Sequence, residues 1–288
     1  MTVTREPELR SAPRPQLTVR PRRIVVAVRD YLHDYETIEW AMTHATAGVD
    51  MIHLVHAYRP LRLIGCHWEP VARAREARYW AARRVIAIAQ QRIAVSAATQ
   101  LQGSAIAGTP TDVLLEMSEV ADLIVVGDDS NDAETSRRIT WRVQDLSQCP
   151  VVCVPITYRT TDDGTRPVTV LADEHGLSEA AMSFGVEAAL RWGTSLQISR
   201  AQTYPDGSSA SSTKRLGDQQ RELDAQLALW AGRYPLLPLT GRVEVDDAWL
   251  DGLRGNCAVL VAPVHSAPLL RPRPLDLSHP CPIAVVPE

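Results

Sequence analysis

Short apolar runs alternate with longer amphipathic stretches along most of this chain. The short runs have the length and composition of strands that are buried on both faces, and this pattern predicts a parallel sheet with helices on either side. In the first half the predicted strands are 24–28, 50–57, 100–107, 123–126 and 151–154. In the second half they are 168–172, 196–201, 241–245, 259–261 and 283–286.

The predicted helices lie between these strands. In 71–96 the apolar positions recur at helical spacing, which predicts one long helix. Ser178 is a suitable N-cap for a helix over 178–192. The other predicted helices are 36–46, 112–120, 140–147 and 215–233.

The end of the chain repeats its middle. Residues 149–155 read Cys-Pro-Val-Val-Cys-Val-Pro, and residues 281–287 read Cys-Pro-Ile-Ala-Val-Val-Pro. Self-similarity at this long spacing indicates a duplicated domain. We predict an N-terminal arm, a first domain, a linker and a second domain, which span 1–21, 22–157, 158–165 and 166–288.

Composition limits where the protein works. No apolar run approaches the ~20 residues that cross a bilayer, and the N-terminus lacks the apolar core of a signal peptide. The five cysteines are an odd number spread over 288 residues, which indicates reduced thiols and not a disulfide framework. We therefore expect a cytoplasmic protein with no membrane partner.

Three motifs carry a family resemblance. Gly108-x-Pro-x-Asp-Val-Leu-Leu-Glu is followed by Ala-Asp-Leu-Ile-Val-Val-Gly over 121–127 and by Cys149-Pro-Val-Val. This set resembles the universal stress protein family, over 22–156 and more faintly over 166–287. The resemblance implies two tandem, Rossmann-like, five-stranded parallel sheets. It also implies an intrachain pseudo-dimer that forms through the two last strands, 151–154 and 283–286, and a role in stress or dormancy physiology.

Many members of that family bind ATP through Gly-x2-Gly-x9-Gly-Ser/Thr, with an Asp at the end of the first strand. Here Gly127 fits the first position, but Ser130 and Thr140 stand where the other two glycines belong. Arg29 stands at the Asp position of the first half, whereas Asp173 keeps it in the second. Glycine allows backbone amides to approach phosphate closely, so these replacements predict degenerate nucleotide sites. We expect no cofactor, with ATP as the alternative.

An acidic loop follows the fourth strand, with Asp128, Asp129, Asp132 and Glu134. We predict that one of its three aspartates occupies the phosphate position, with Arg137 or Arg138 neutralising the others. In the second half the residues after Val261 include four prolines, and Ala262 is taken as the counterpart of Gly127. Prolines remove amide donors, so no phosphate loop is expected there.

No other cluster predicts a metal ion or a catalytic group. Cys149 and Cys153 lack a partner pair, and the acidic loop lacks the spacing of a calcium loop. His53 and His56 are placed on opposite faces of a strand, and Cys66-His67-Trp68 is assigned to packing. The group Asp173, His175 and Ser178 has no nucleophile motif beside it. We therefore predict a protein that is not an enzyme.

Arginine dominates the basic residues, because Lys214 is the only lysine among 30 Lys and Arg residues. The arm is basic, and five arginines lie on the predicted long helix: Arg73, Arg75, Arg78, Arg83 and Arg84. A basic arm can dock on nucleic acid or on a ribosome. The leading hypothesis is a regulatory protein that acts through an unknown protein partner, with a homodimer left open. The alternatives are an ATP-binding stress protein with weak or no ATPase activity, and an RNA-associated factor that uses the arm.

Overall fold

The computed structural model describes residues 20–30, 33–60, 69–93, 100–128, 133–159, 166–172, 176–201, 209–244, 257–266 and 281–288. The first half contains β1 (Arg23–Ala27), α1 (Tyr35–His44), β2 (Met51–Tyr58), α2 (Glu69–Ile93), β3 (Gln100–Ala107), α3 (Pro110–Ser118), β4 (Leu123–Asp128), α4 (Ala133–Leu146) and β5 (Val151–Pro155). The second half contains β6 (Val168–Ala172), α5 (Glu179–Trp192), β7 (Leu196–Ala201), α6 (Ser209–Arg233), β8 (Leu239–Glu244), β9 (Val259–Pro263), a short 3-10 turn (Val264–Ser266) and β10 (Ile283–Val286).

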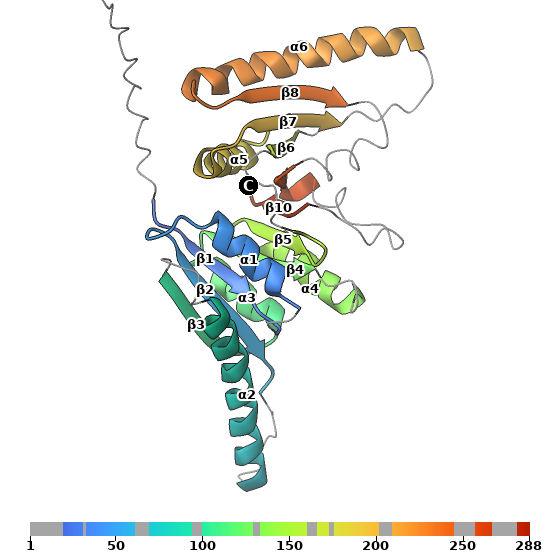
Figure 1. The fold of residues 1–288 in the computed structure, drawn as a ribbon. Coiled ribbons are helices and arrows are strands. Elements are labelled where there is room, and N and C mark those ends of the chain that lie inside the picture. Colours follow the sequence, from blue (N-terminus) through green and yellow to red (C-terminus); the bar gives the residue numbers. More distant parts are fainter. Residues whose placement is uncertain are drawn as a thin grey trace, which may run out of the picture.

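All of these strands belong to one ten-stranded sheet, in the order β3-β2-β1-β4-β5-β10-β9-β6-β7-β8 (Figure 1). Read from its outer edge, each half therefore has the same strand order. Neighbouring strands are parallel everywhere except at the centre, where β10 pairs antiparallel with β5. Ala284 lies opposite Val152 in that pair. The predicted contact between the two last strands is thus present, and it joins the halves into one sheet.

The register corrects one correspondence between the halves. In the first half Ile124 lies opposite Val151, and in the second Leu260 lies opposite Ile283. Because Val151 and Ile283 each follow their Cys-Pro pair directly, Ile124 and Leu260 occupy equivalent positions. The counterpart of Gly127 is therefore Pro263, and not Ala262 as the sequence suggested.

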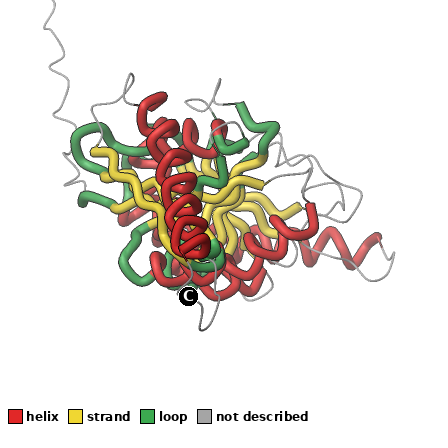
Figure 2. The backbone as a smooth tube through the Cα atoms, turned by 90° about the horizontal axis from the view of Figure 1, so that it is seen from below, coloured by secondary structure: helices red, strands yellow, loops and turns green. Residues whose placement is uncertain are grey.

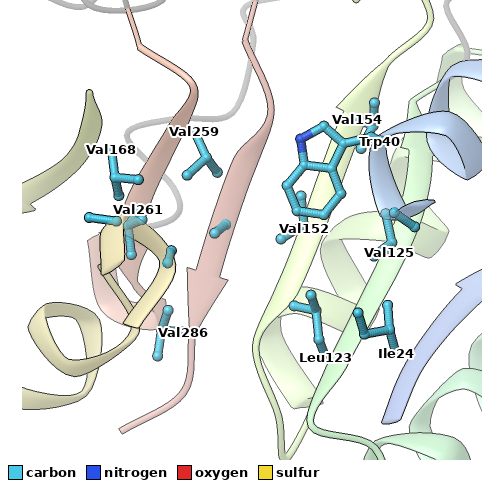
Figure 3. Packing of buried hydrophobic residues seen from close by; sticks show 14 of the residues in the cluster. Ile24, Trp40, Leu123, Val125, Val152, Val154, Val168, Val259, Val261 and Val286 are labelled. Atoms are coloured by element: carbon cyan, nitrogen blue, oxygen red, sulfur yellow. The ribbon is translucent and has the colours of Figure 1, made fainter. Parts of the chain in front are cut away.

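Helices cover both faces of the first half and at least one face of the second (Figures 1 and 2). On one face α1, α2, α5 and α6 pack over a single apolar cluster that runs through both halves. Figure 3 shows this cluster continuing from Val152 and Val154 to Val259, Val261 and Val286. On the other face α3 and α4 cover a separate cluster in the first half. The two halves therefore share a core on one face only.

The Gly108-x-Pro motif has a local structural role. Gly108 has a positive φ of 159°, and a Cβ there would meet Val113 Cγ2 at 2.8 Å. Thr109 caps α3 by accepting a hydrogen bond from the Asp112 amide, and Pro110 fills the first helical position. The predicted N-cap of α5 is confirmed in the same way, because Ser178 Oγ accepts a bond from the Ala181 amide.

A polar and aromatic junction joins the halves beside the shared core. The ring of Trp40 on α1 stacks on His44, and both contact Trp192 at the end of α5. Beneath them the buried carboxylate of Asp50 binds Arg191 of the second half, with Nη1 3.4 Å from both oxygens. No described helix is both long and apolar enough to cross a membrane.

Candidate functional site

A small cavity opens at the carboxyl ends of β1, β2 and β4, where a parallel sheet usually holds its ligand. Its volume is about 160 Å³. The lining is mainly apolar and consists of Ala27, Val28, Arg29, Asp34, Val55, His56, Ala57, Pro110, Leu114, Val126, Gly127, Ile139 and Thr140. Among the described residues of this lining, Arg29 is the only arginine or lysine and Asp34 the only carboxylate. The described lining thus holds one basic and one acidic side chain.

The carboxylate of Asp34 closes the loop that follows β1. Its Oδ2 accepts hydrogen bonds from the backbone amides of Arg29 at 2.5 Å and Asp30 at 3.0 Å. The residue is only 4% exposed. Both donors belong to the loop that follows β1. A carboxylate of the chain itself therefore accepts these two loop amides.

The local sequence explains why Asp34 faces the loop. It stands at the N-cap of α1, yet its side chain makes no capping hydrogen bond to the helix. The backbone instead starts α1, because the Asp34 carbonyl accepts the bond from the Ile38 amide. The side chain is then free to turn back onto the strand end. The Asp34 side chain therefore binds the amides of the β1–α1 loop, and not those of the first turn of α1.

Gly127 lies directly against the start of α1. A Cβ at this position would lie 2.7 Å from Thr37 Oγ1 and 3.1 Å from Asp34 Oδ1. Real Cβ atoms essentially never lie as close as 2.7 Å to another heavy atom, so a larger residue here would require the Thr37 side chain or α1 to shift. The glycine therefore suits the packing of the chain against itself, independently of any phosphate.

Two further side chains shape the cavity wall. His56 Nδ1 lies 2.7 Å from the Val28 carbonyl, which can only accept, so Nδ1 donates this hydrogen bond. Thr140 on α4 is buried and lines the same cavity. The wall thus offers one imidazole and one hydroxyl beside the carboxylate.

The environment of Asp34 changes its acidity. Burial raises its pKa to about 6, although the amide bonds from Arg29 and Asp30 and the charge of Arg29 act in the opposite direction. The effect of burial on the pKa is larger than the opposite effect of these partners. Asp34 therefore gains its proton about two pH units above its ordinary value of 3.8.

This shift predicts a pH-dependent stability. The folded protein holds the Asp34 proton more tightly than the unfolded chain, so its contribution is complete below pH 3.8 and is lost as the pH rises through 6. The loss approaches about 3 kcal/mol, at about 1.4 kcal/mol per pH unit. Asp34→Asn keeps an acceptor for the amides but cannot titrate. Urea unfolding at several pH values measures this effect. The free energy of unfolding of the variant, relative to that of the parent, should rise by up to about 3 kcal/mol between pH 4 and 7.5. A constant difference between the two proteins would contradict the buried carboxylate.

The predicted site residues are only partly tested. Gly127 and Thr140 do line one cavity. Ser130 and Asp173 lie outside the described residues, as do Asp129 and Asp132 of the acidic loop. Asp128 ends β4 and is half-buried, and the carboxylate that accepts the loop amides at the end of β1 is Asp34. Sequence reasoning missed Asp34, although an Asp just before an amphipathic helix is a usable signal of a functional or capping carboxylate.

The equivalent end of the second half differs. Pro263 takes the place of Gly127, and proline has no amide to offer to an anion. A cavity of about 320 Å³ lies nearby, between the start of α5, His265 and Glu288. His265 Nδ1 lies 2.6 Å from Glu288 Oε1 at its rim.

Neither a protein-family model nor a curated protein matches this sequence. Solved structures do match its fold. A universal stress protein from Archaeoglobus fulgidus is 13% identical and aligns over 93% of this chain and 97% of its own, with a TM-score of 0.61. The cytoplasmic domain of a prokaryotic cation chloride cotransporter is 8% identical and aligns over 92% and 95%, with a TM-score of 0.50.

These likenesses establish the architecture. The chain has the Rossmann-like α/β fold of universal stress proteins, and the resemblance read from its sequence motifs is confirmed at the level of fold. The identities are too low to carry ligand or activity from those proteins to this one.

Proposed function

We propose that this chain is a non-enzymatic regulatory protein of the universal stress protein type, whose first-half nucleotide site is filled by its own Asp34. The observation that carries the proposal is the pair of bonds from the Arg29 and Asp30 amides to Asp34 Oδ2. In this proposal the protein acts in stress physiology by binding a protein partner, and its signal is not the capture of ATP.

The size of the cavity supports this proposal. About 160 Å³ remain at the strand ends, whereas small-molecule sites usually offer about 300–1,000 Å³. A nucleotide would have to move α1, which lies against Gly127 through Thr37 and Asp34. The start of α1 lies where the nucleotide would need space, and the Asp34 carboxylate binds the Arg29 and Asp30 amides.

The charge of the site supports it as well. A phosphate placed about 4 Å from an ionised Asp34 would be repelled by about 4 kcal/mol per charge near a protein surface. Arg29 is the single lining cation that offsets this repulsion. Anion binding therefore requires that Asp34 be protonated or displaced.

Nucleotide titration tests the proposal. The parent protein should show no change in melting temperature with ATP and Mg²⁺, with AMP, or with cyclic AMP. Asp34→Ala frees the two loop amides, so a gain of nucleotide binding in that variant would identify Asp34 as the occupant. Stabilisation of the parent by about 2.7 kcal/mol, the value for a ligand at about 100 times its Kd, would instead favour the ATP-binding alternative.

A second candidate function rests on α2. Its amino-terminal part projects beyond the sheet (Figure 1), and the helix buries only a narrow face through Ala82, Ile86 and Ala89. Arg73, Trp80 and Arg84 are spaced by seven and four residues, which places them together on the opposite face. Trp80 is 60% exposed. Arginine beside an exposed indole is a surface that single-stranded nucleic acid can contact through phosphate and base stacking.

Binding of a labelled single-stranded RNA tests this candidate, which takes α2 and not the N-terminal arm as the contact surface. Residues 1–19 of the arm lie outside the described residues. Trp80→Ala and the pair Arg73→Ala and Arg84→Ala should each weaken binding at least several-fold, and binding should fall steeply with salt. Arg221→Ala on α6 is the matched control, because Arg221 already pairs with Asp218. Equal affinity for all variants would exclude α2 as a nucleic-acid surface.

A further inference from the structure

Two buried thiols lie together in the second half. Cys257 stands two residues before β9, and Cys281 stands two residues before β10. Their Sγ atoms are 3.2 Å apart, and the residues are 1% and 0% exposed. Both are in the reduced form in this structure. We propose that Cys257 and Cys281 form a reversible oxidation site that closes to a disulfide.

The backbone around the thiols is already positioned for this bond. β9 and β10 are neighbouring parallel strands, with Leu260 opposite Ile283. The Leu260 amide donates to the Pro282 carbonyl at 2.9 Å, directly beside Cys281. Continued past the strand ends, this register puts Cys281 level with Ala258, the residue after Cys257. Across neighbouring strands about 4.8 Å apart, an offset of one residue (about 3.3 Å) gives a Cα separation of about 6 Å, within the range of about 4.4–6.8 Å that a disulfide spans. Side-chain rotation, without movement of the strands, can therefore bring the sulfurs into bonding distance.

The first half lacks the pair. The common register makes Cys149 the counterpart of Cys281, and it makes Ala121 the counterpart of Cys257. Cys149 instead lies 3.7 Å from Ser147 Oγ, and burial raises its pKa to about 11. The position of Cys257 thus holds Ala121 in the first half, so this close pair of thiols is a feature of the second half.

The surroundings favour a disulfide over a metal site. The two sulfurs lie in an apolar cluster with Leu171, Leu260, Ala262, Ile283 and Val285. No group of three or more potential metal ligands occurs among the described residues. A structural zinc site needs about four ligands, and two thiols cannot supply them.

Hydrogen peroxide is the oxidant in the proposed reaction. One thiol sulfur attacks a peroxide oxygen, so a sulfur–oxygen bond forms, the oxygen–oxygen bond breaks, and water leaves with the thiol proton. The second sulfur then attacks the sulfenic sulfur, and the departing hydroxide takes the second thiol proton as water. Two thiols and one peroxide give one disulfide and two waters, and a dithiol reductant reverses the change. Because both thiols are buried, the first step requires local opening.

The bond would join two strands next to the centre of the sheet. It closes a loop between residues that are 24 positions apart, and it fastens β10, which pairs with β5 of the first half. Oxidation is therefore expected to raise the melting temperature, because a closed loop restricts the unfolded chain.

Peroxide treatment of the full chain, followed by unfolding in denaturant, alkylation and peptide mass spectrometry, tests the site. The expected result is one linkage between Cys257 and Cys281, with a loss of two hydrogen masses and full reversal by dithiothreitol. Cys149 should stay alkylatable, and Cys149→Ser should leave the linkage unchanged. Cys257→Ser should abolish both the linkage and the rise in melting temperature. Three results on the parent protein would each overturn the proposal. Cys257 and Cys281 could remain alkylatable after excess peroxide, they could form separate sulfinic acids, or either could link to another cysteine.

Discussion

Replacing Asp50 with Ala is expected to lower the free energy of unfolding by about 3–5 kcal/mol, the usual cost of removing one member of a buried charge pair. Asp50 is fully buried between Arg22 of the first half and Arg191 of the second. Its oxygens also accept bonds from the amides of Arg22 at 2.9 Å and Thr46 at 2.8 Å. The variant removes this shared acceptor from two guanidiniums and two amides. Urea unfolding measures the loss.

A matched control separates burial from charge. Glu187→Gln removes an exposed carboxylate that contacts the same Arg191, 2.8 Å from its Nε. Such exposed pairs contribute about 0–1 kcal/mol, so this variant should stay close to the parent. Equal losses from Asp50→Ala and Glu187→Gln would contradict the buried role of Asp50.

Acid should weaken the same junction. Burial raises the pKa of Asp50, but amide bonds from Thr46 and Arg22 and the charge of Arg22 outweigh it, and the pKa lies below its ordinary value of 3.8. Since the folded pKa is the lower one, the stability that Asp50 contributes is present above pH 3.8 and is lost as the pH falls below it. The difference between the parent and Asp50→Ala should therefore shrink in strong acid.

Replacing Trp40 with Ala is expected to cost about 3–5 kcal/mol, as for other large aromatic side chains in a core. Trp40 is 0% exposed and lies beside Val152 and Val154 of β5, facing the part of the cluster that the second half supplies (Figure 3). Its indole Nε1 has no hydrogen-bond partner among the described residues, so the loss reflects packing alone.

Trp80 provides the control within the same chain. Since it is largely exposed on α2, Trp80→Ala should change stability by less than about 0.5 kcal/mol. A comparison of the two denaturation curves measures the effect. If Trp40→Ala were as mild as Trp80→Ala, the core would not be shared between the halves as Figure 3 shows.

Sequence pattern predicted the strands well because they are short apolar runs buried on both faces. The apolar last strands also predicted the β5–β10 contact, since such an edge needs a cover. Helix starts were harder to place. The structure begins α6 at Ser209 and α4 at Ala133, earlier than predicted, because polar residues in their first turns carry no apolar repeat.

The site was predictable only in part. Gly127 and Thr140 came from a motif, and both line the cavity. Asp34 belongs to no motif, and its role depends on how the β1–α1 loop folds back onto Gly127. Similarly, Asp50 and Arg191 are 141 residues apart, and only the joined sheet brings them together. Such long-range polar contacts leave no periodic trace in the sequence.

The carboxyl chemical shift of Asp34, followed against pH in isotope-labelled protein with and without ATP and Mg²⁺, tests the central claim most directly. Asp34→Asn assigns the signal. If this carboxylate fills the site at the end of β1, its pKa will be about 6 and will not change with nucleotide. An ordinary pKa near 3.8, or a titration that ATP displaces, would show that the end of β1 is open to a ligand.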